Sequence, residues 1–175
     1  MLTAITSATV VLNNLSFDKI HATSTTLAQC WKSAYKGLVN DEYLSSLEDT
    51  HWSEFLEKSI NDKMTNCIVA ETSDNIIGVC IFGQSITEKY PDDGEIISLY
   101  VIPDSIGKGI GSMLFEKAQQ LIKGQGYRAC IICTFVKNYK AISFYKAHGY
   151  EIVSQDEAVK MGTQSLPYVI MRKVL

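Results

Sequence analysis

The most informative segment of this chain is Pro103-Asp104-Ser105-Ile106-Gly107-Lys108-Gly109-Ile110-Gly111-Ser112. It connects an apolar run, residues 96–102, to a run with helical periodicity, residues 113–122. We therefore expect a strand that enters a helix through a glycine-rich turn. Glycine lets a ligand lie directly on the backbone, and the free N–H groups at a helix start favour phosphate oxygens. The segment thus predicts a pyrophosphate-binding turn.

The glycine spacing separates this turn from two common phosphate-binding motifs. A dinucleotide fingerprint needs Gly-x-Gly-x-x-Gly and a P-loop needs Gly-x4-Gly-Lys-Ser/Thr, but the glycines here follow the order Gly107-x-Gly109-x-Gly111. The turn resembles instead the acyl-CoA loop of the GNAT N-acetyltransferase superfamily, written Gln/Arg-x-x-Gly-x-Gly/Ala. Gly109 and Gly111 match that pattern, whereas Ile106 stands at the Gln/Arg position and departs from it.

A second segment strengthens this resemblance. Residues 138–150 resemble the GNAT segment Asn-x-x-Ala-x-x-Phe-Tyr-x-x-x-Gly-Phe/Tyr, and every fixed position is present: Asn138, Ala141, Phe144, Tyr145, Gly149 and Tyr150. Two motifs in the right order and at the right separation are more specific than either motif alone. The resemblance is good over residues 65–155 and looser over the N-terminal third.

Length and composition fit one domain, residues 1–175, with a substantial core, because 46% of the residues are hydrophobic. The mean hydropathy of +0.04 argues against disorder, and no apolar stretch has the length of a membrane span. The first lysine is Lys19, so a secretory signal is not expected. The five cysteines, odd in number, are expected to be reduced and buried in a cytoplasmic protein. Cys130 and Cys133 should face opposite sides of a strand, and no zinc or other metal site is expected.

Charge is distributed unevenly along the chain. Residues 95–150 hold seven basic and three acidic residues, a balance of +4, while the whole chain carries −3, so the remainder carries −7. The pattern is either ordinary surface charge or a basic region facing an anionic cofactor and an acidic region attracting a cationic amine. The pI near 5.6 and the lack of a basic cluster argue against nucleic-acid binding.

Periodicity and turn signals give an order of one strand, two or three helices, three strands, helix, strand, helix and two strands. We expect strands at 6–12, 67–70, 76–82, 95–102, 128–136, 150–153 and 168–174, and helices at 16–37, 41–47, 52–60, 113–122 and 139–147. This order predicts an α+β fold, and it matches the GNAT order. The resemblance adds a three-layer α/β arrangement, in which a mixed, largely antiparallel sheet has helices on both faces and a cleft where two strands splay apart.

The resemblance implies acetyl transfer from acetyl-CoA, as a cosubstrate, to an amine that attacks directly in a ternary complex. The implied cofactor-binding residues are the strand edge Leu99, Tyr100 and Val101, the turn Ile106, Gly107, Lys108, Gly109, Ile110, Gly111 and Ser112, and the helix residues Asn138, Ala141 and Tyr145. Asn138 has a second reading as a helix cap, and Lys108 has a second reading as a solvated surface charge.

Glu95 is the candidate general base and Tyr145 the candidate general acid. A carboxylate needs burial to be an effective base near neutral pH, and a phenol pKa near 10 is close to that of an alkyl thiol. Each has a plainer reading: Glu95 as a solvated acid beside Asp92 and Asp93, and Tyr145 as a core aromatic. His21, His51 and His148 are weaker alternative bases, and Cys130 or Cys133 is a weaker alternative nucleophile.

The acceptor is least defined by the sequence. Trp31, Tyr35 and Tyr43 are candidates for the acceptor wall, with core packing as the other reading of Trp31, and the acidic loop 88–95 could approach a cation. A small cationic amine is the first expected substrate class, and a peptide N-terminus or protein lysine the second. A non-catalytic acyl-CoA-binding module is the rival function. A homodimer is compatible with the resemblance.

Overall fold

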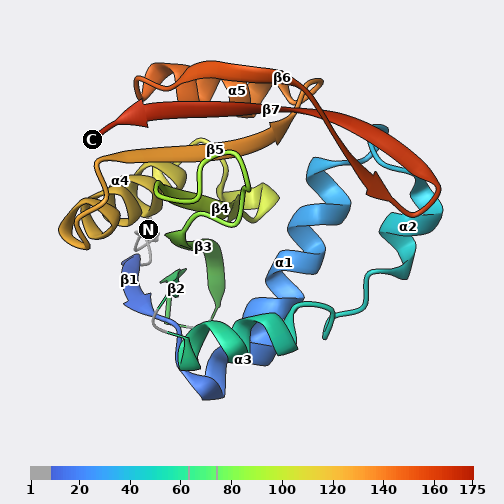
Figure 1. The fold of residues 1–175 in the computed structure, drawn as a ribbon. Coiled ribbons are helices and arrows are strands. Elements are labelled where there is room, and N and C mark those ends of the chain that lie inside the picture. Colours follow the sequence, from blue (N-terminus) through green and yellow to red (C-terminus); the bar gives the residue numbers. More distant parts are fainter. Residues whose placement is uncertain (1–8, 63, 74) are drawn as a thin grey trace, which may run out of the picture.

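The computed structural model describes residues 9–62, 64–73 and 75–175 (Figure 1). A single seven-stranded sheet runs through them in the order β1-β2-β3-β4-β5-β7-β6. All neighbouring strands are antiparallel except β4 and β5, which are parallel. The strands are β1 Val11–Asn14, β2 Thr65–Glu71, β3 Ile76–Gln84, β4 Gly94–Val101, β5 Ala129–Phe135, β6 Glu151–Met161 and β7 Gln164–Val174.

Helices cover both faces of the sheet, as the resemblance implied. On one face, Leu27 and Leu56 pack against Val69 and Val79 of β2 and β3. On the other face, a larger cluster joins α4 and Tyr145 of α5 to Ile68 and other residues of the central strands. The helices are α1 Ile20–Ala34, α2 Asp41–Ser46, α3 Ser53–Asn61, α4 Ile110–Gly124 and α5 Tyr139–Ala147, with single 3-10 turns at Phe17–Lys19 and Pro103–Ser105.

Strands β4 and β5 part almost as soon as they meet. Their only paired residues are Gly94 with Cys130 and Glu95 with Ile131. Strand β4 also carries one extra residue, Ile97, opposite the step from Ile81 to Phe82 of β3, and such a bulge bends its strand. Beyond Glu95, the backbone groups of β4 that face β5 therefore have no strand partner, which confirms the predicted splayed cleft.

The last two strands differ most from the sequence prediction. We expected short strands at 150–153 and 168–174, whereas β6 and β7 each have 11 residues and form a long hairpin. Residues 154–161 are largely polar and lie at the sheet edge, so they lack the apolar alternation by which strands are recognised. In Figure 1 the hairpin crosses beyond β5 and reaches the region of α1 and α2.

Smaller differences occur at other element ends. Helix α4 begins at Ile110, three residues before the predicted start, and Ser16 makes no capping hydrogen bond through its side chain. Of the first strand, predicted at 6–12, residues 6–8 lie outside the described residues, and the described strand is Val11–Asn14. None of the described helices is long and apolar enough to cross a membrane.

Candidate active site

The glycine turn has the geometry expected of an anion-binding helix start. Gly107 and Gly109 have φ of 82° and 81°, a left-handed conformation in which only glycine is unstrained. Gly109 is the N-cap of α4 and supplies no capping side chain, and the first helical bond runs from the Met113 N–H to the Gly109 carbonyl at 3.0 Å. Within the described residues, the N–H groups of residues 107–112 have no hydrogen-bond partner. These groups lie at the N-terminal end of α4, where the helix dipole is positive.

Two adjoining cavities lie near the splay of β4 and β5. The smaller cavity, of about 180 Å³, lies where these strands part. Its lining brings together predicted residues from three parts of the chain: Leu99, Tyr100, Val101, Ile106, Asn138, Ala141 and Tyr145. The other predicted turn residues, 107–112, are not part of this lining and lie at the adjoining helix start. The side chain of Ile106, at the position where the family has Gln or Arg, is 68% exposed.

Asn138 caps helix α5. Its side-chain oxygen accepts a hydrogen bond from the Ala141 N–H at 3.3 Å. The capping role proposed from the sequence is therefore confirmed. The residue also lines the smaller cavity, so the cap fixes the amide beside the cleft.

Tyr145 packs in the core and also reaches the cleft. Its ring stacks on Phe115 with centroids 5.9 Å apart, and the residue is 8% exposed. No hydrogen bond to its hydroxyl is formed by any described residue. Burial, with a smaller contribution from the neighbouring Tyr35, raises the pKa of this phenol above its ordinary value. The reading of Tyr145 as a core aromatic is therefore confirmed, and the residue also lines the cavity, while its role as general acid stays a prediction.

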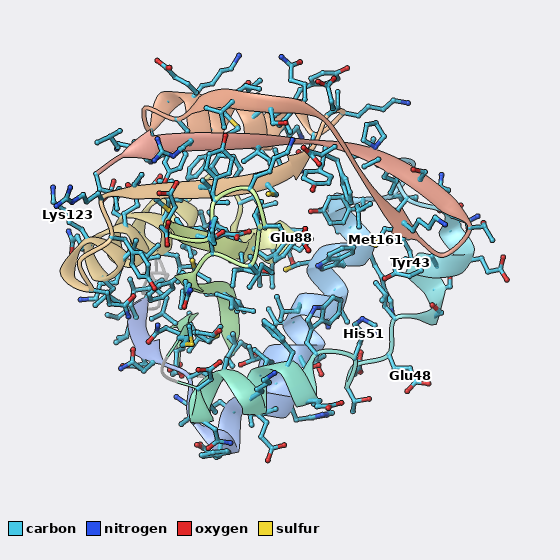
Figure 2. The ribbon with its side chains drawn as sticks, in the orientation of Figure 1. Tyr43, Glu48, His51, Glu88, Lys123 and Met161 are labelled. Atoms are coloured by element: carbon cyan, nitrogen blue, oxygen red, sulfur yellow. The ribbon has the colours of Figure 1, made fainter. Side chains whose placement is uncertain are left out.

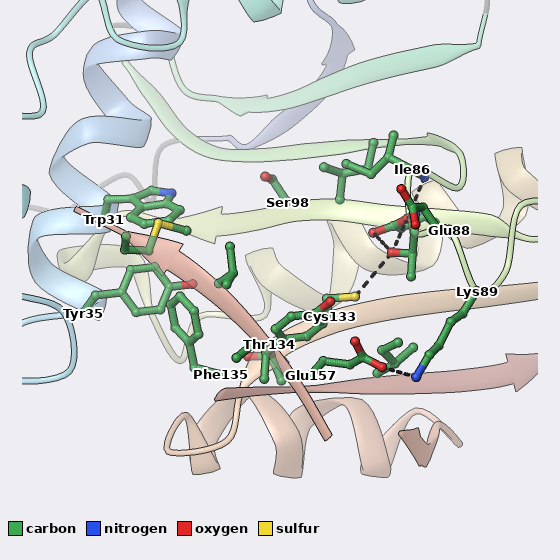
Figure 3. Close-up of a pocket in the computed structure, with 18 of the residues that line it drawn as sticks. Trp31, Tyr35, Ile86, Glu88, Lys89, Ser98, Cys133, Thr134, Phe135 and Glu157 are labelled. Carbon is green, nitrogen blue, oxygen red and sulfur yellow. Dashed lines mark hydrogen bonds and ion pairs between the residues drawn. The ribbon is translucent and has the colours of Figure 1, made fainter. Parts of the chain in front are cut away.

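A larger cavity of about 530 Å³ adjoins the smaller one, and the two share Tyr35, Ile97, Ser98, Tyr100, Cys133 and Thr134 in their linings. Figure 3 shows Trp31, Tyr35 and Phe135 gathered at one end of the larger cavity and Lys89 at the other. Trp31 also packs on Tyr35 and Trp52, with centroids 4.6 and 5.7 Å apart. It is therefore both a wall of the cavity and part of a hydrophobic cluster.

The hydroxyls of Tyr35 and Tyr100 meet at 2.9 Å where the two cavities join. Burial raises the pKa of both phenols, and for Tyr100 the neighbouring Tyr35 adds to the rise. Both groups therefore stay neutral at physiological pH and act as hydrogen-bond donors and acceptors rather than as charges.

Glu95 lies in the wall of the larger cavity and is 3% exposed. Its Oε2 accepts hydrogen bonds from the Ile86 N–H at 2.9 Å, the Thr87 N–H at 3.2 Å and the hydroxyls of Ser85 and Thr87 at 2.9 and 3.1 Å. Its Oε1 accepts only a longer bond, 3.3 Å, from the Thr87 hydroxyl. The reading of Glu95 as a solvated acid is therefore wrong, because the carboxylate is buried and holds the loop after β3.

The two neighbouring acids are placed differently. Asp93 accepts two bonds from Arg172, at 2.6 and 3.2 Å, and neither it nor the exposed Asp92 lines the larger cavity. None of the three histidines lines either cavity. His148 instead packs on Phe115 and Phe144, with its Nδ1 2.8 Å from the Phe144 carbonyl.

Cys130 and Cys133 face opposite sides of β5, as predicted. Cys130 belongs to the core, whereas Cys133 lines both cavities. Burial raises the pKa of Cys130 to about 12 and that of Cys133 to about 11, so neither is an activated nucleophile. Among the described residues, no cluster of His, Cys, Asp or Glu could hold a metal ion.

Several cavity residues were missed by the sequence analysis. They come from the hairpin and from the loop after β3: Ile86, Thr87, Lys89, Glu157, Ala158, Val159, Met161, Tyr168 and Ile170. The acidic loop was expected near the acceptor, and its Glu88 does line the larger cavity. Tyr43 does not line it: its ring packs where β6 turns into β7, near Gly162, and Figure 2 places Tyr43 and Met161 at this end of the hairpin.

Comparisons with known proteins agree with this geometry. A family model described as "Acetyltransferase (GNAT) family" matches residues 29–150. A spermidine N(1)-acetyltransferase from Thermoplasma acidophilum is 25% identical over 154 residues, which cover 84% of this chain and 91% of that protein.

Two solved structures share the fold over nearly their whole length. The PaiA N-acetyltransferase of Thermoplasma acidophilum, in complex with coenzyme A, superposes with a TM-score of 0.74 and 21% identity, covering 95% of this chain and 99% of its own. The putative acetyltransferase YncA of Salmonella typhimurium, with acetyl-CoA, gives 0.74 and 17%, covering 96% and 95%.

Proposed function

The chain belongs to the GNAT acetyltransferase family, and on that premise we propose that it transfers an acetyl group from acetyl-CoA to the primary amine of a small cationic molecule. The observation that carries the proposal is the meeting of two cavities at the splay of β4 and β5. One is bordered by free backbone groups, and the other by aromatic rings and carboxylates. Donor and acceptor would meet at their shared wall.

The donor would lie along the smaller cavity. The free N–H groups of Gly107, Lys108, Gly109, Ile110, Gly111 and Ser112 would bind its pyrophosphate. The unpaired edge of β4 at Leu99–Val101 would hold the amides of the pantetheine arm, with Asn138 and Ala141 on the opposite wall. Because this recognition uses main-chain groups, it tolerates Ile106 in place of Gln or Arg. The PaiA and YncA structures, which share the fold, contain coenzyme A and acetyl-CoA.

Glu95 would accept the amine proton through water. Its Oε2 is occupied by four donors, so Oε1 is the oxygen with capacity to accept a further hydrogen bond. The freed amine nitrogen would then form a bond to the acyl carbon as the bond from that carbon to sulfur breaks. Fixing one carboxylate oxygen would leave the other for the water that relays the proton.

Tyr145 would return a proton to the leaving thiolate. Burial raises its phenol pKa, but the same burial raises the pKa of a thiol, as it does for Cys133 on the shared wall. Burial thus shifts the pKa of both kinds of group in the same direction, and both are weaker acids than in water.

A small cationic acceptor is favoured by the walls of the larger cavity. Three carboxylates, Glu88, Glu95 and Glu157, line it beside a single lysine, and Trp31, Tyr35 and Tyr168 supply aromatic faces on which cations bind. The Thermoplasma relative is named for spermidine. We further propose a cytoplasmic location, since all five cysteines are free thiols. A homodimer stays a prediction.

The test is a thiol-release assay with acetyl-CoA against amines, diamines, amino sugars, amino acids and short peptides, beside a thermal-shift titration with CoA. We expect turnover with cationic amines and a CoA-dependent rise in Tm. A rise in Tm without turnover on any small amine would favour a protein acceptor or a binding module. No rise at all would refute the proposed donor site.

A further inference from the structure

An ammonium group already occupies the wall of the larger cavity, and it belongs to the protein itself. The Lys89 Nζ forms an ion pair with the Glu157 carboxylate and lies 3.4 Å from the Ser154 hydroxyl. The Ser154 hydroxyl in turn donates to Glu157 at 3.2 Å. Figure 3 shows the lysine reaching across from the loop after β3 to the hairpin. The protein therefore contains a formed binding position for one ammonium ion.

The position is built by an irregularity of β6. Ser154 pairs with Ile170 and Glu157 pairs with Tyr168. Between these two pairs β6 advances by three residues and β7 by only two, so β6 contains one extra residue. This bulge breaks the alternation of the strand, leaving residues 155 and 156 exposed and Glu157 partly buried in the cavity wall. Tyr168, directly opposite Glu157, lines the same cavity. A carboxylate and a hydroxyl thus contact the ammonium, and an aromatic residue lies opposite the carboxylate on the neighbouring strand.

Lys89 is a replaceable occupant. Its side chain is 55% exposed and comes from the loop between β3 and β4, whereas the Glu157 side chain is 22% exposed and comes from the sheet. Exposed ion pairs of this kind contribute little to stability. A second ammonium could therefore displace Lys89 at small cost, and the lysine would turn into solvent.

The position also lies apart from the wall that the two cavities share. Glu157, Lys89 and Tyr168 line the larger cavity but not the smaller one, whereas Ser98, Tyr100 and Cys133 line both. An acceptor whose reacting amine lies at the shared wall would place a distal group toward Glu157. The excess of carboxylates over lysines on the lining disfavours an anionic distal group.

We propose that Glu157, Ser154 and Tyr168 form a subsite for the second ammonium of a diamine or polyamine, and that Lys89 occupies this subsite when no acceptor is bound. The inference rests on the proposed function and adds to it the number of charges that the acceptor carries. It assigns opposite roles to the two partners of one ion pair. Glu157 binds the acceptor, and Lys89 competes with it.

The test compares 1,4-diaminobutane with butylamine, which has the same chain length and one charge fewer. The measured quantity is the ratio of kcat/KM for the diamine to that for the monoamine. Glu157→Gln should lower the ratio about ten-fold, because a charged hydrogen bond to the distal ammonium is lost. Lys89→Met should raise it about two- to five-fold, because the competing ammonium is gone. Lys160→Met, which removes an exposed lysine from the same strand, should leave it unchanged.

Calorimetric titration of 1,4-diaminobutane into the CoA-bound protein separates this inference from the proposed function. Tighter binding to Lys89→Met than to wild type, without turnover in either, would uphold the subsite and refute the transferase proposal. Turnover with an unchanged ratio in both variants would refute the subsite alone. A lower ratio in Lys89→Met would also refute it, since the lysine would then be aiding the acceptor. If Glu157→Gln fails to fold, the kcat/KM ratio and the titration of Lys89→Met decide whether the subsite exists.

Discussion

Tyr145 both packs in the core and lines the smaller cavity. Its ring is part of the core cluster around Phe115, while its hydroxyl has no hydrogen-bond partner among the described residues and the residue lines the smaller cavity. Substitution by phenylalanine keeps the ring and removes only the hydroxyl. This substitution therefore distinguishes the packing role of the ring from the proposed proton transfer by the hydroxyl.

We predict that Tyr145→Phe lowers kcat about 100-fold, the lower range for loss of a general acid, and leaves the CoA-dependent rise in Tm intact. Tyr139→Phe is the matched control, because Tyr139 lies on the same helix and is 71% exposed. It should behave as wild type in both assays. Equal activity of the two variants would remove Tyr145 from the mechanism.

At the scale of single elements, two glycines at opposite ends of α4 allow the role of the glycine turn to be tested. Gly109 needs its left-handed conformation, whereas Gly124, at the other end of α4, has open space around it and no positive φ. We predict that Gly109→Ala lowers the free energy of unfolding by about 1–2 kcal/mol and weakens CoA binding at least ten-fold. Urea unfolding and a CoA titration measure the two effects.

Gly124→Ala should change neither quantity by a comparable amount. If Gly109→Ala were destabilised but bound CoA as tightly as wild type, the turn would be structural and the pyrophosphate would bind elsewhere.

The β6–β7 hairpin is held at its far end by α2. The Asn40 N–H donates to the Gln164 side-chain oxygen at 2.6 Å, and the ring of Tyr43 packs against Gly162. We predict that Gln164→Ala speeds amide hydrogen exchange in residues 158–166 and raises KM for the amine a few-fold, because Val159 and Met161 line the larger cavity, where we propose that the amine binds. The CoA-dependent rise in Tm should not change.

Gln155→Ala is the control for this prediction, since Gln155 is exposed on the same hairpin. Unchanged exchange in Gln164→Ala would mean that the ladder between the two strands, rather than the contact with α2, holds the hairpin.

Sequence reasoning succeeded where the signal is local. The glycine turn and the capped α5 segment are short stretches of distinctive composition. The order of elements follows from similar local signals along the chain. It failed where a side chain reaches the site through the register of a strand pair. Glu157 becomes a cavity residue only because a bulge in β6 shifts its register against β7. Residues 154–157 are all polar and give no periodic signal. Glu95 was found, but its burial depends on a loop that folds back over it.

At the scale of the whole molecule, buried thiols make the free energy of unfolding depend on pH in the alkaline range. Burial raises the pKa of Cys30, Cys67 and Cys130 to about 12, from an ordinary value of 9.0. The unfolded chain therefore releases these protons near pH 9, whereas the native protein retains them. This contribution is complete below pH 9 and is lost as the pH rises toward 12.

We predict that the free energy of unfolding falls above pH 9 by about 1.4 kcal/mol per pH unit for each of these thiols. Urea unfolding between pH 8 and pH 10.5 measures the slope. Cys67→Ala should reduce the slope by one thiol's share, whatever its effect on absolute stability. A slope identical to wild type would show that the Cys67 thiolate is tolerated in the native core.

The early parting of β4 and β5 has a consequence for how such an enzyme can diverge. Donor recognition would depend on main-chain groups that nearly every sequence supplies, whereas acceptor recognition would depend on side chains from β6, β7 and the loop after β3. Substitutions in the hairpin can then retarget the acceptor without disturbing the donor. The fold would thus separate donor binding by main-chain groups from acceptor binding by side chains, and a new amine specificity would require changes in only one of the two.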